Sequence, residues 1–131
     1  MSDVTVTHDS GDRFDIAIRG HVVQVDQPES DGGSDTAPTP TELFVASLAS
    51  CVAFYARRYL MRHDLPQEGL TVTAQALAGS KPSRVASMTI TLALPGGVPE
   101  EKRQALLAVA SHCTGHNTLT HPPEVLVQLA D

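Results

Sequence analysis

The longest apolar stretch of the chain runs from Leu43 to Ala56, and no residue within it carries a charge. Just before it, Thr39, Pro40 and Glu42 have the spacing of a capping box, in which the Thr and Glu side chains bond to free backbone amides of the first helical turn. Apolar side chains spread around most of the helix circumference, so we expect the helix to be buried and too short to span a bilayer. The pattern predicts a core helix that ends near His63.

Shorter segments alternate apolar and polar residues in the manner of β-strands. A second helix is expected to open at Pro99, with acidic residues in its first turn, and to end at Gly115. This order, βββ-α-ββ-α-β, predicts one α+β domain over residues 1–131. The predicted strands cover residues 4–7, 13–18, 21–25, 70–77, 85–94 and 125–129, and loops cover 26–38 and 117–123.

Charge and composition narrow the choice of partners and compartment. A formal net charge of −6 with only nine Lys and Arg argues against nucleic acid or an anionic membrane as a partner. The first residues lack the basic and then apolar pattern of a secretory signal, so a cytoplasmic protein is expected. With three Phe, two Tyr and no Trp, the core is modest, which suits a dimer that buries more surface on association.

The two cysteines, Cys51 and Cys113, are the first candidates for chemistry. A single buried cysteine is usually an inert small hydrophobe. Here each lies on the apolar side of a different predicted helix, so the two side chains could face one another across the core. Such a pair can cycle, because a thiolate that becomes a sulfenic acid condenses with a second thiol to form a disulfide.

A mid-helix thiol needs a nearby cation to become reactive. Cys51 lies about three turns from the helix start, too far for the helix dipole to favour the thiolate much. A guanidinium within about 4–6 Å would do so. Glu42 is fully explained by the capping box, although a cap at the mouth of a site could also orient an arginine. The candidate cations are Arg13, Arg19, Arg57 and Arg58.

A small group of histidines offers a different chemistry. His112 and His116 are four residues apart, His121 follows, and Cys113-x-x-His116 has a spacing seen in zinc sites. Gly115 and the loop after it would break the helical register of such a site. Polar surface or loop capping is therefore the favoured role of these histidines over metal binding.

The run from Pro38 to Cys51 resembles the osmotically inducible protein C (OsmC-like) family, in which a Gly-rich loop enters a buried helix through a similar run ending in cysteine. Gly32-Gly33 stand before the run here, and the segment Cys113–Leu119 looks like the family's second-cysteine segment. The segment Gly20–Pro28 is similar to a strand and turn of one branch. Together these likenesses cover nearly the whole chain.

The chain departs from the family's pattern at three places. Thr41 stands ten residues before the first cysteine, where one branch has its catalytic glutamate, and Glu42 is one residue nearer. Thr114 follows the second cysteine, where the family usually has proline. Arg13, after Gly11-Asp12, only approximates the family's arginine segment.

The resemblance implies an intertwined α+β homodimer, with long helices buried between two sheets and two active sites at the dimer interface. It also implies cofactor-free, thiol-dependent reduction of organic hydroperoxides in an oxidative stress response, with Cys51 peroxidatic and Cys113 resolving. Arg13 would support the thiolate and Glu42 would hold that arginine. A lipoylated or thioredoxin-like thiol donor would regenerate the protein.

Two other functions compete with this one. The first is a protein of the same fold that binds a small apolar ligand without turnover, having lost the Arg-Glu pair. The second is a metal-binding protein that uses Cys113 and the nearby histidines. Reactivity of Cys51 separates the peroxidase from the binding protein, and stoichiometric zinc would favour the metal-binding protein.

Overall fold

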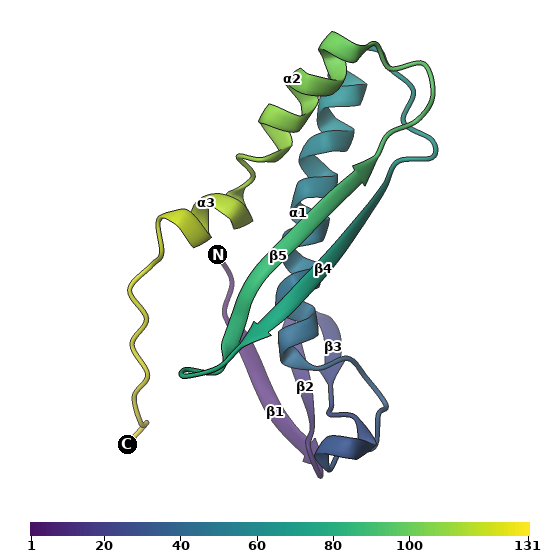
Figure 1. Cartoon of the computed structure of the whole chain (residues 1–131). Coiled ribbons are helices and arrows are strands. Elements are labelled where there is room, and N and C mark those ends of the chain that lie inside the picture. The colour runs from purple at the N-terminus through teal and green to yellow at the C-terminus, as the bar shows by residue number, and fades with distance from the viewer. The chain divides into compact units, whose positions relative to one another are not determined.

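A computed structural model describes all residues, 1–131, and the chain divides into two compact units, residues 1–45 and 46–131. The long helix α1 (Pro40–Arg62) begins in the first unit and supplies the central helix of the second (Figure 1). Five strands and three α-helices confirm the α+β class. The assignment of a single domain stays a prediction.

Unit 1 contains an antiparallel sheet of β1 (Val4–Ser10), β2 (Arg13–Ile18) and β3 (His21–Val25), with β2 in the centre. A two-residue turn, Arg19-Gly20, joins β2 to β3, and both residues have positive φ, 49° and 85°. Type I′ hairpin turns require positive φ at both positions because their twist matches that of the strands. The predicted hairpin is therefore confirmed.

The loop after β3 is organised by Asp26, a carboxylate that is only 1% exposed. Asp26 accepts hydrogen bonds from the Gln27 amide (2.7 Å), the Thr36 amide (3.0 Å) and the Thr36 hydroxyl (2.8 Å). These bonds, led by the Thr36 amide, lower the pKa of Asp26 to about 2. A Cβ at Gly33 would lie 2.0 Å from the Gln27 carbonyl oxygen, so only glycine fits there. The short 3₁₀ helix η1 (Glu29–Asp31) lies within this loop.

We expect Asp26→Asn to reduce stability at neutral pH and to lose that effect in acid. The folded pKa of Asp26, about 2, lies below its ordinary value of 3.8. Its carboxylate therefore stabilises the fold above about pH 4, and this contribution disappears as the pH falls through about 2. Urea midpoints of wild type and Asp26→Asn should converge over that window. Asp31→Asn, at an exposed position of the same loop, is the control, and a constant difference between wild type and Asp26→Asn would contradict the prediction.

The start of α1 confirms the capping box. The Thr39 amide donates to Glu42 Oε1 at 2.9 Å, and the Glu42 amide donates to Thr39 Oγ1 at 3.0 Å. Beyond Arg62 the chain turns, and Asp64 has a positive φ of 53°. The helix boundaries predicted from the sequence are therefore correct to within one or two residues.

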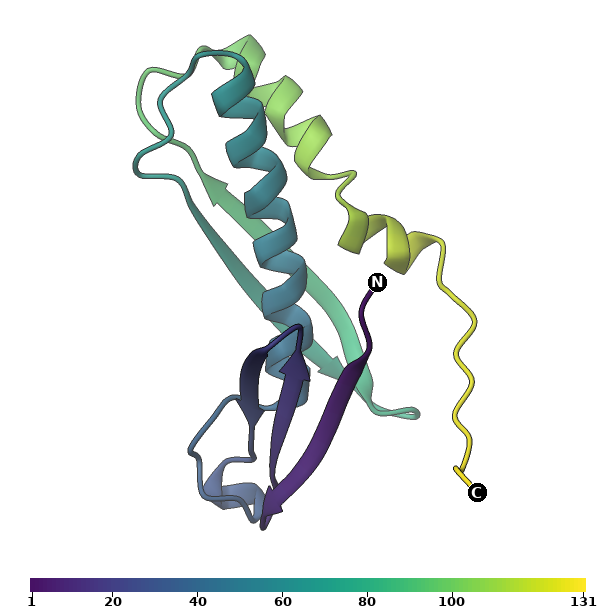
Figure 2. The same ribbon diagram turned by 180° about the vertical axis from the view of Figure 1, so that it is seen from behind.

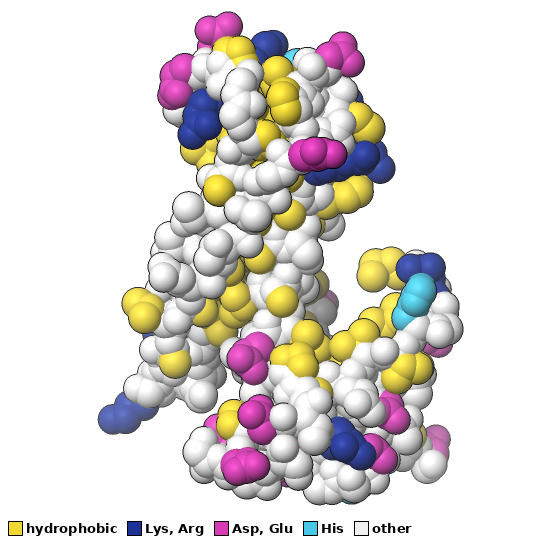
Figure 3. Space-filling model, turned by 90° about the vertical axis from the view of Figure 1, so that its right-hand side faces the viewer, with side chains coloured by type: hydrophobic (Ala, Val, Ile, Leu, Met, Phe, Trp, Pro, Cys, Tyr) yellow, Lys and Arg dark blue, Asp and Glu magenta, His cyan; other side chains and the backbone are white.

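The expectation that α1 is buried all round is wrong within this chain. One side packs into the core, but Phe44 and Phe54 are 49% and 50% exposed, and hydrophobic side chains reach the surface in Figure 3. The helix also has 23 residues, so by length and composition it could cross a bilayer, and the expectation that it was too short is wrong. Its packing is that of a core helix. Its buried residues are Leu48, Val52, Ala56, Tyr59 and Leu60.

In unit 2, a β-hairpin and a second helix pack against α1. The antiparallel hairpin of β4 (Thr71–Gly79) and β5 (Arg84–Ala93) and the helix α2 (Glu100–Ala110) both lie beside α1 (Figures 1 and 2). Because side chains alternate along a strand, one face of the hairpin meets the helix. The side chains that complete the core are Leu106, Ala110 and Cys113, with Val72, Met88, Ile90 and Leu92 of the hairpin packed against them.

The C-terminal part of the chain differs from the sequence prediction. Gly115 does not end the second helix; α2 ends at Ala110, and a further helix, α3 (Thr114–Thr120), occupies part of the predicted loop. Residues 125–129 form no strand and extend away from the helices of unit 2 (Figure 1). A strand needs a neighbour for its backbone groups, and no strand of this chain pairs with this segment. Its side chains Val125, Leu126, Val127 and Leu129 are 80–96% exposed.

Candidate active site

Both cysteines lie where α1 meets the beginning of α3. Cys51 is half-buried on α1, between Leu48 and Tyr55, which project from the same side of the helix because they lie three and four residues away. Cys113 is fully buried, at 0% exposure. The sequence placed it on the second helix, but it lies after α2 and is the N-cap residue of α3.

The first turn of α3 gives each sulfur a backbone donor. The Gly115 amide donates to Cys51 Sγ at 3.4 Å, and the His116 amide donates to Cys113 Sγ at 3.4 Å. The two cysteines are free thiols, and they lie close enough for Cys51 to raise the pKa of Cys113. The structure therefore brings the only two thiols of the chain together at the first turn of α3.

The surroundings of the two thiols differ. Burial raises the pKa of Cys113, and the nearby Cys51 raises it further. The amides of His116 and Gly115 oppose this rise only in part. Cys113 is therefore held as a protonated, enclosed thiol, whereas Cys51 is the thiol that a small molecule can reach.

Three residues that build this arrangement were not identified from the sequence. A Cβ at Gly115 would lie 3.1 Å from Leu48 Cδ1 and 3.6 Å from Cys51 Cβ, so glycine allows the close approach of α3 to α1. The hydroxyls of Tyr55 and Thr114 lie 2.9 Å apart and join the same two helices. The only signal in the sequence was position, since Tyr55 lies one turn after Cys51 and the other two follow Cys113 directly.

Arg13 and Glu42 lie in unit 1, and each has a partner there. Arg13 Nε forms an ion pair with Asp9 Oδ2 at 2.5 Å, next to the β1–β2 turn. Glu42 caps α1 through Thr39. These contacts give both residues a structural role, and their catalytic roles stay predictions.

The other candidate arginines have surface positions. Arg19 occupies the β2–β3 turn, and the Arg58 guanidinium lies 4.6 Å from the centre of the Phe54 ring. Arg57 is exposed on α1. The pKa of Cys113 is shifted mainly by burial, by two backbone amides and by Cys51, and no guanidinium is among these causes.

The histidines bond to nearby backbone and hydroxyl groups instead of forming a cluster. His112 Nδ1 bonds to the Ala108 carbonyl at 2.7 Å, and His116 Nδ1 bonds to the Ser111 carbonyl. Nowhere in the chain do three His, Cys, Asp or Glu side chains come together as metal ligands would. The favoured interpretation, local capping, fits these contacts.

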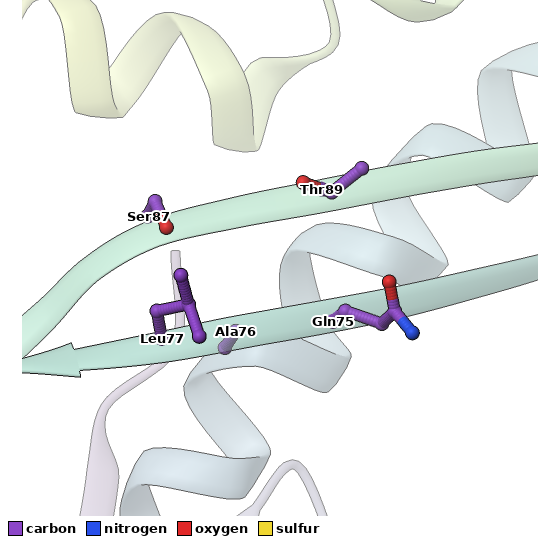
Figure 4. Close-up of a pocket in the computed structure, with 5 residues that line it drawn as sticks. All are labelled: Gln75, Ala76, Leu77, Ser87 and Thr89. Atoms are coloured by element: carbon purple, nitrogen blue, oxygen red, sulfur yellow. The ribbon is translucent and has the colours of Figure 1, made fainter.

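A pocket elsewhere in unit 2 offers little chemistry. It lies on the β4–β5 hairpin and is lined by Gln75, Ala76, Leu77, Ser87 and Thr89 (Figure 4). None of these side chains is ionisable near neutral pH, and no base lies among them to activate the serine. The two thiols are therefore the stronger candidate site.

Several solved structures of known proteins have a fold similar to that of this chain. Similar solved structures include a protein assigned to the osmotic stress and detoxification response from Psychrobacter arcticus 273-4, with a TM-score of 0.83, 20% identity, and coverage of 90% of this chain and 88% of that one. An OsmC like protein from Mycoplasma pneumoniae has a TM-score of 0.78 and 14% identity, with coverage of 92% and 87%. An organic hydroperoxide resistance protein OsmC from Legionella pneumophila has a TM-score of 0.62 and 19% identity, with coverage of 91% and 90%.

At these identities the likeness establishes the fold alone. No curated protein sequence matches the chain. The family model described as OsmC-like protein, however, matches residues 32–128, which include both cysteines and most of the secondary structure. The chain therefore belongs to the OsmC-like protein family.

Proposed function

We propose that this protein is a thiol-dependent peroxidase that reduces organic hydroperoxides. The observation that carries the proposal is that a half-exposed Cys51 and a buried Cys113, both free thiols, lie together at the first turn of α3. Family membership supports a redox or hydroperoxide-resistance role, and similar folds include organic hydroperoxide resistance proteins from Legionella pneumophila and Elizabethkingia anophelis.

The proposed cycle has three steps. The Cys51 thiolate attacks the outer peroxide oxygen, an S–O bond forms as the O–O bond breaks, and the alkoxide leaves as an alcohol after taking up a proton. The Cys113 sulfur then attacks the Cys51 sulfenic acid, forming the disulfide and releasing water. A dithiol donor, lipoylated or thioredoxin-like, reduces this disulfide and is itself oxidised. No cofactor is needed in these steps.

The proposal includes a homodimer in the cytoplasm. Half-exposed Phe54 in the middle of a core helix, together with Met61 at 39% exposure, leaves apolar surface that a second copy could cover. Family membership supports the same assembly.

Turnover with a dithiol donor tests the function. Reduced protein mixed with cumene hydroperoxide and excess dihydrolipoamide should consume many equivalents of the hydroperoxide. A protein with both thiols reduced that leaves the hydroperoxide untouched would contradict the proposal and favour a non-catalytic protein that binds a small apolar ligand.

Arg13 and Glu42 are proposed to support the reactivity of Cys51. In a Cys113→Ser background, Arg13→Ala should slow iodoacetamide alkylation of Cys51 at neutral pH by about tenfold, because a nearby guanidinium favours the thiolate. Glu42→Gln should slow it less. Alkylation rates from about pH 5 to pH 10 measure the effect, and Arg84→Ala, on the β4–β5 hairpin, is the control. If Arg13→Ala leaves the pH dependence of the alkylation rate unchanged, Arg13 does not support Cys51, and its role is the ion pair with Asp9.

A further inference from the structure

A hydrogen bond between two side-chain hydroxyls joins the two segments that carry the thiols. Tyr55 Oη lies 2.9 Å from Thr114 Oγ1, although the two residues are 59 positions apart in the sequence. Tyr55 lies one helical turn after Cys51, and Thr114 directly follows Cys113. We refer to this contact as the hydroxyl pair.

The helix α3 is short and exposed, so it needs contacts with α1 to hold its place. The helix α3 has seven residues, none of which is buried, and an isolated helix of this length is not stable in water. Its other contacts with α1 include the Gly115 amide on Cys51 Sγ and the packing of Gly115 against Leu48. His121 caps the end of α3, and the residues after it are exposed. The hydroxyl pair is therefore one of the contacts that hold α3 against α1.

We propose that Tyr55 and Thr114 are positioning residues that keep Cys113 within reach of Cys51. The hydroxyl pair raises the effective concentration of one thiol at the other, as any contact that restricts two tethered groups does. A proline after the second cysteine would have no hydroxyl to form this bond, so the threonine gives this chain its own means of fixing the segment.

The consequence for turnover rests on the proposed function. A Cys51 sulfenic acid has two fates. Attack by Cys113 forms the disulfide and releases water, whereas attack on a second hydroperoxide oxidises the sulfur to the sulfinic acid and releases an alcohol. Because the first fate is intramolecular, a well-held Cys113 favours the disulfide. Loss of the hydroxyl pair shifts the partition toward the sulfinic acid.

Disulfide formation in glutathione buffers measures the effective concentration without any peroxide. The protein dithiol reacts with oxidised glutathione to give the protein disulfide and two reduced glutathiones. Tyr55→Phe and Thr114→Val should each lower the effective concentration about three- to tenfold, the size expected for one hydrogen bond. Thr114→Ser retains the hydroxyl and should restore the wild-type value. Thr118→Val is the control, because its hydroxyl bonds to the Thr114 carbonyl within α3.

Two results together identify the role of the hydroxyl pair. The double variant Tyr55→Phe/Thr114→Val should lose no more than either single variant, since both remove the same bond. With rising cumene hydroperoxide, intact mass should show more gain of two oxygens in Tyr55→Phe than in wild type. Equal effective concentrations in wild type, Tyr55→Phe and Thr114→Val would overturn the proposal. A wild type that forms the disulfide in glutathione but is unchanged by hydroperoxide would overturn the peroxidase function alone.

Discussion

Cys51→Ser is expected to abolish hydroperoxide consumption, with a fall of at least about a thousandfold. The reacting group in the proposed cycle is a thiolate, and a serine hydroxyl is not ionised near neutral pH. The substitution changes one atom on a half-buried helical side chain, so α1 and its capping box should remain intact. Residual hydroperoxide, measured over time with excess dithiol, gives the rate.

Cys113→Ser should stop the same cycle one step later. One equivalent of hydroperoxide should be consumed, and the product should be a sulfenic acid on Cys51 that a dimedone probe captures. Ser50→Ala, next to Cys51 on an exposed part of α1, is the control and should turn over like wild type. Equal hydroperoxide consumption by wild type and Cys51→Ser would remove Cys51 from the mechanism.

The second large effect concerns assembly. We expect sedimentation to give twice the 13.9 kDa chain mass and an unfolding midpoint that rises with protein concentration, because folding and association are coupled in an obligate dimer. Phe54, half-exposed on the core helix, is the most suitable site to test this. Phe54→Asp should yield a monomer or an unfolded chain, because it would bury an unpaired charge at the interface.

A control substitution distinguishes the loss of the dimer interface from the effect of an added charge. Gln104→Asp introduces the same charge at an exposed position of α2 and should leave the dimer intact. A wild-type protein that is monomeric and well folded at micromolar concentration would refute the dimer.

Local patterns in the sequence were sufficient to predict the N-terminal two-thirds of the fold. The capping box of Thr39 and Glu42 depends on residues three apart, and the Arg19-Gly20 turn depends on two adjacent positive φ angles. Each is determined by neighbours along the chain, so single-sequence reasoning can detect it. The pairing of β4 with β5 follows in the same way from alternation and a short turn.

The C-terminal third could not be predicted in the same way because contacts distant in sequence determine it. Gly115 has the appearance of a helix terminator, but its lack of a Cβ serves close packing against Leu48. Cys113 begins a helix because its side chain accepts from the His116 amide. The alternation at residues 125–129 indicates a strand, yet a strand requires a partner that this chain does not supply.

The same limit applies to the candidate site. Composition drew attention to Cys51 and Cys113 because they are the only cysteines, but Tyr55 and Thr114 are ordinary residues until α3 folds onto α1. The assignment of a cation from spacing along the chain is weaker still. Arg13 forms an ion pair with Asp9, which no spacing pattern had indicated.

Intact mass spectrometry of the reduced protein, before and after one equivalent of an alkyl hydroperoxide, tests the two-thiol cycle most directly. We predict a loss of two hydrogens, which corresponds to a disulfide between Cys51 and Cys113, and its absence in Cys51→Ser. An unchanged mass in a protein whose two thiols are both free and reduced would contradict the account.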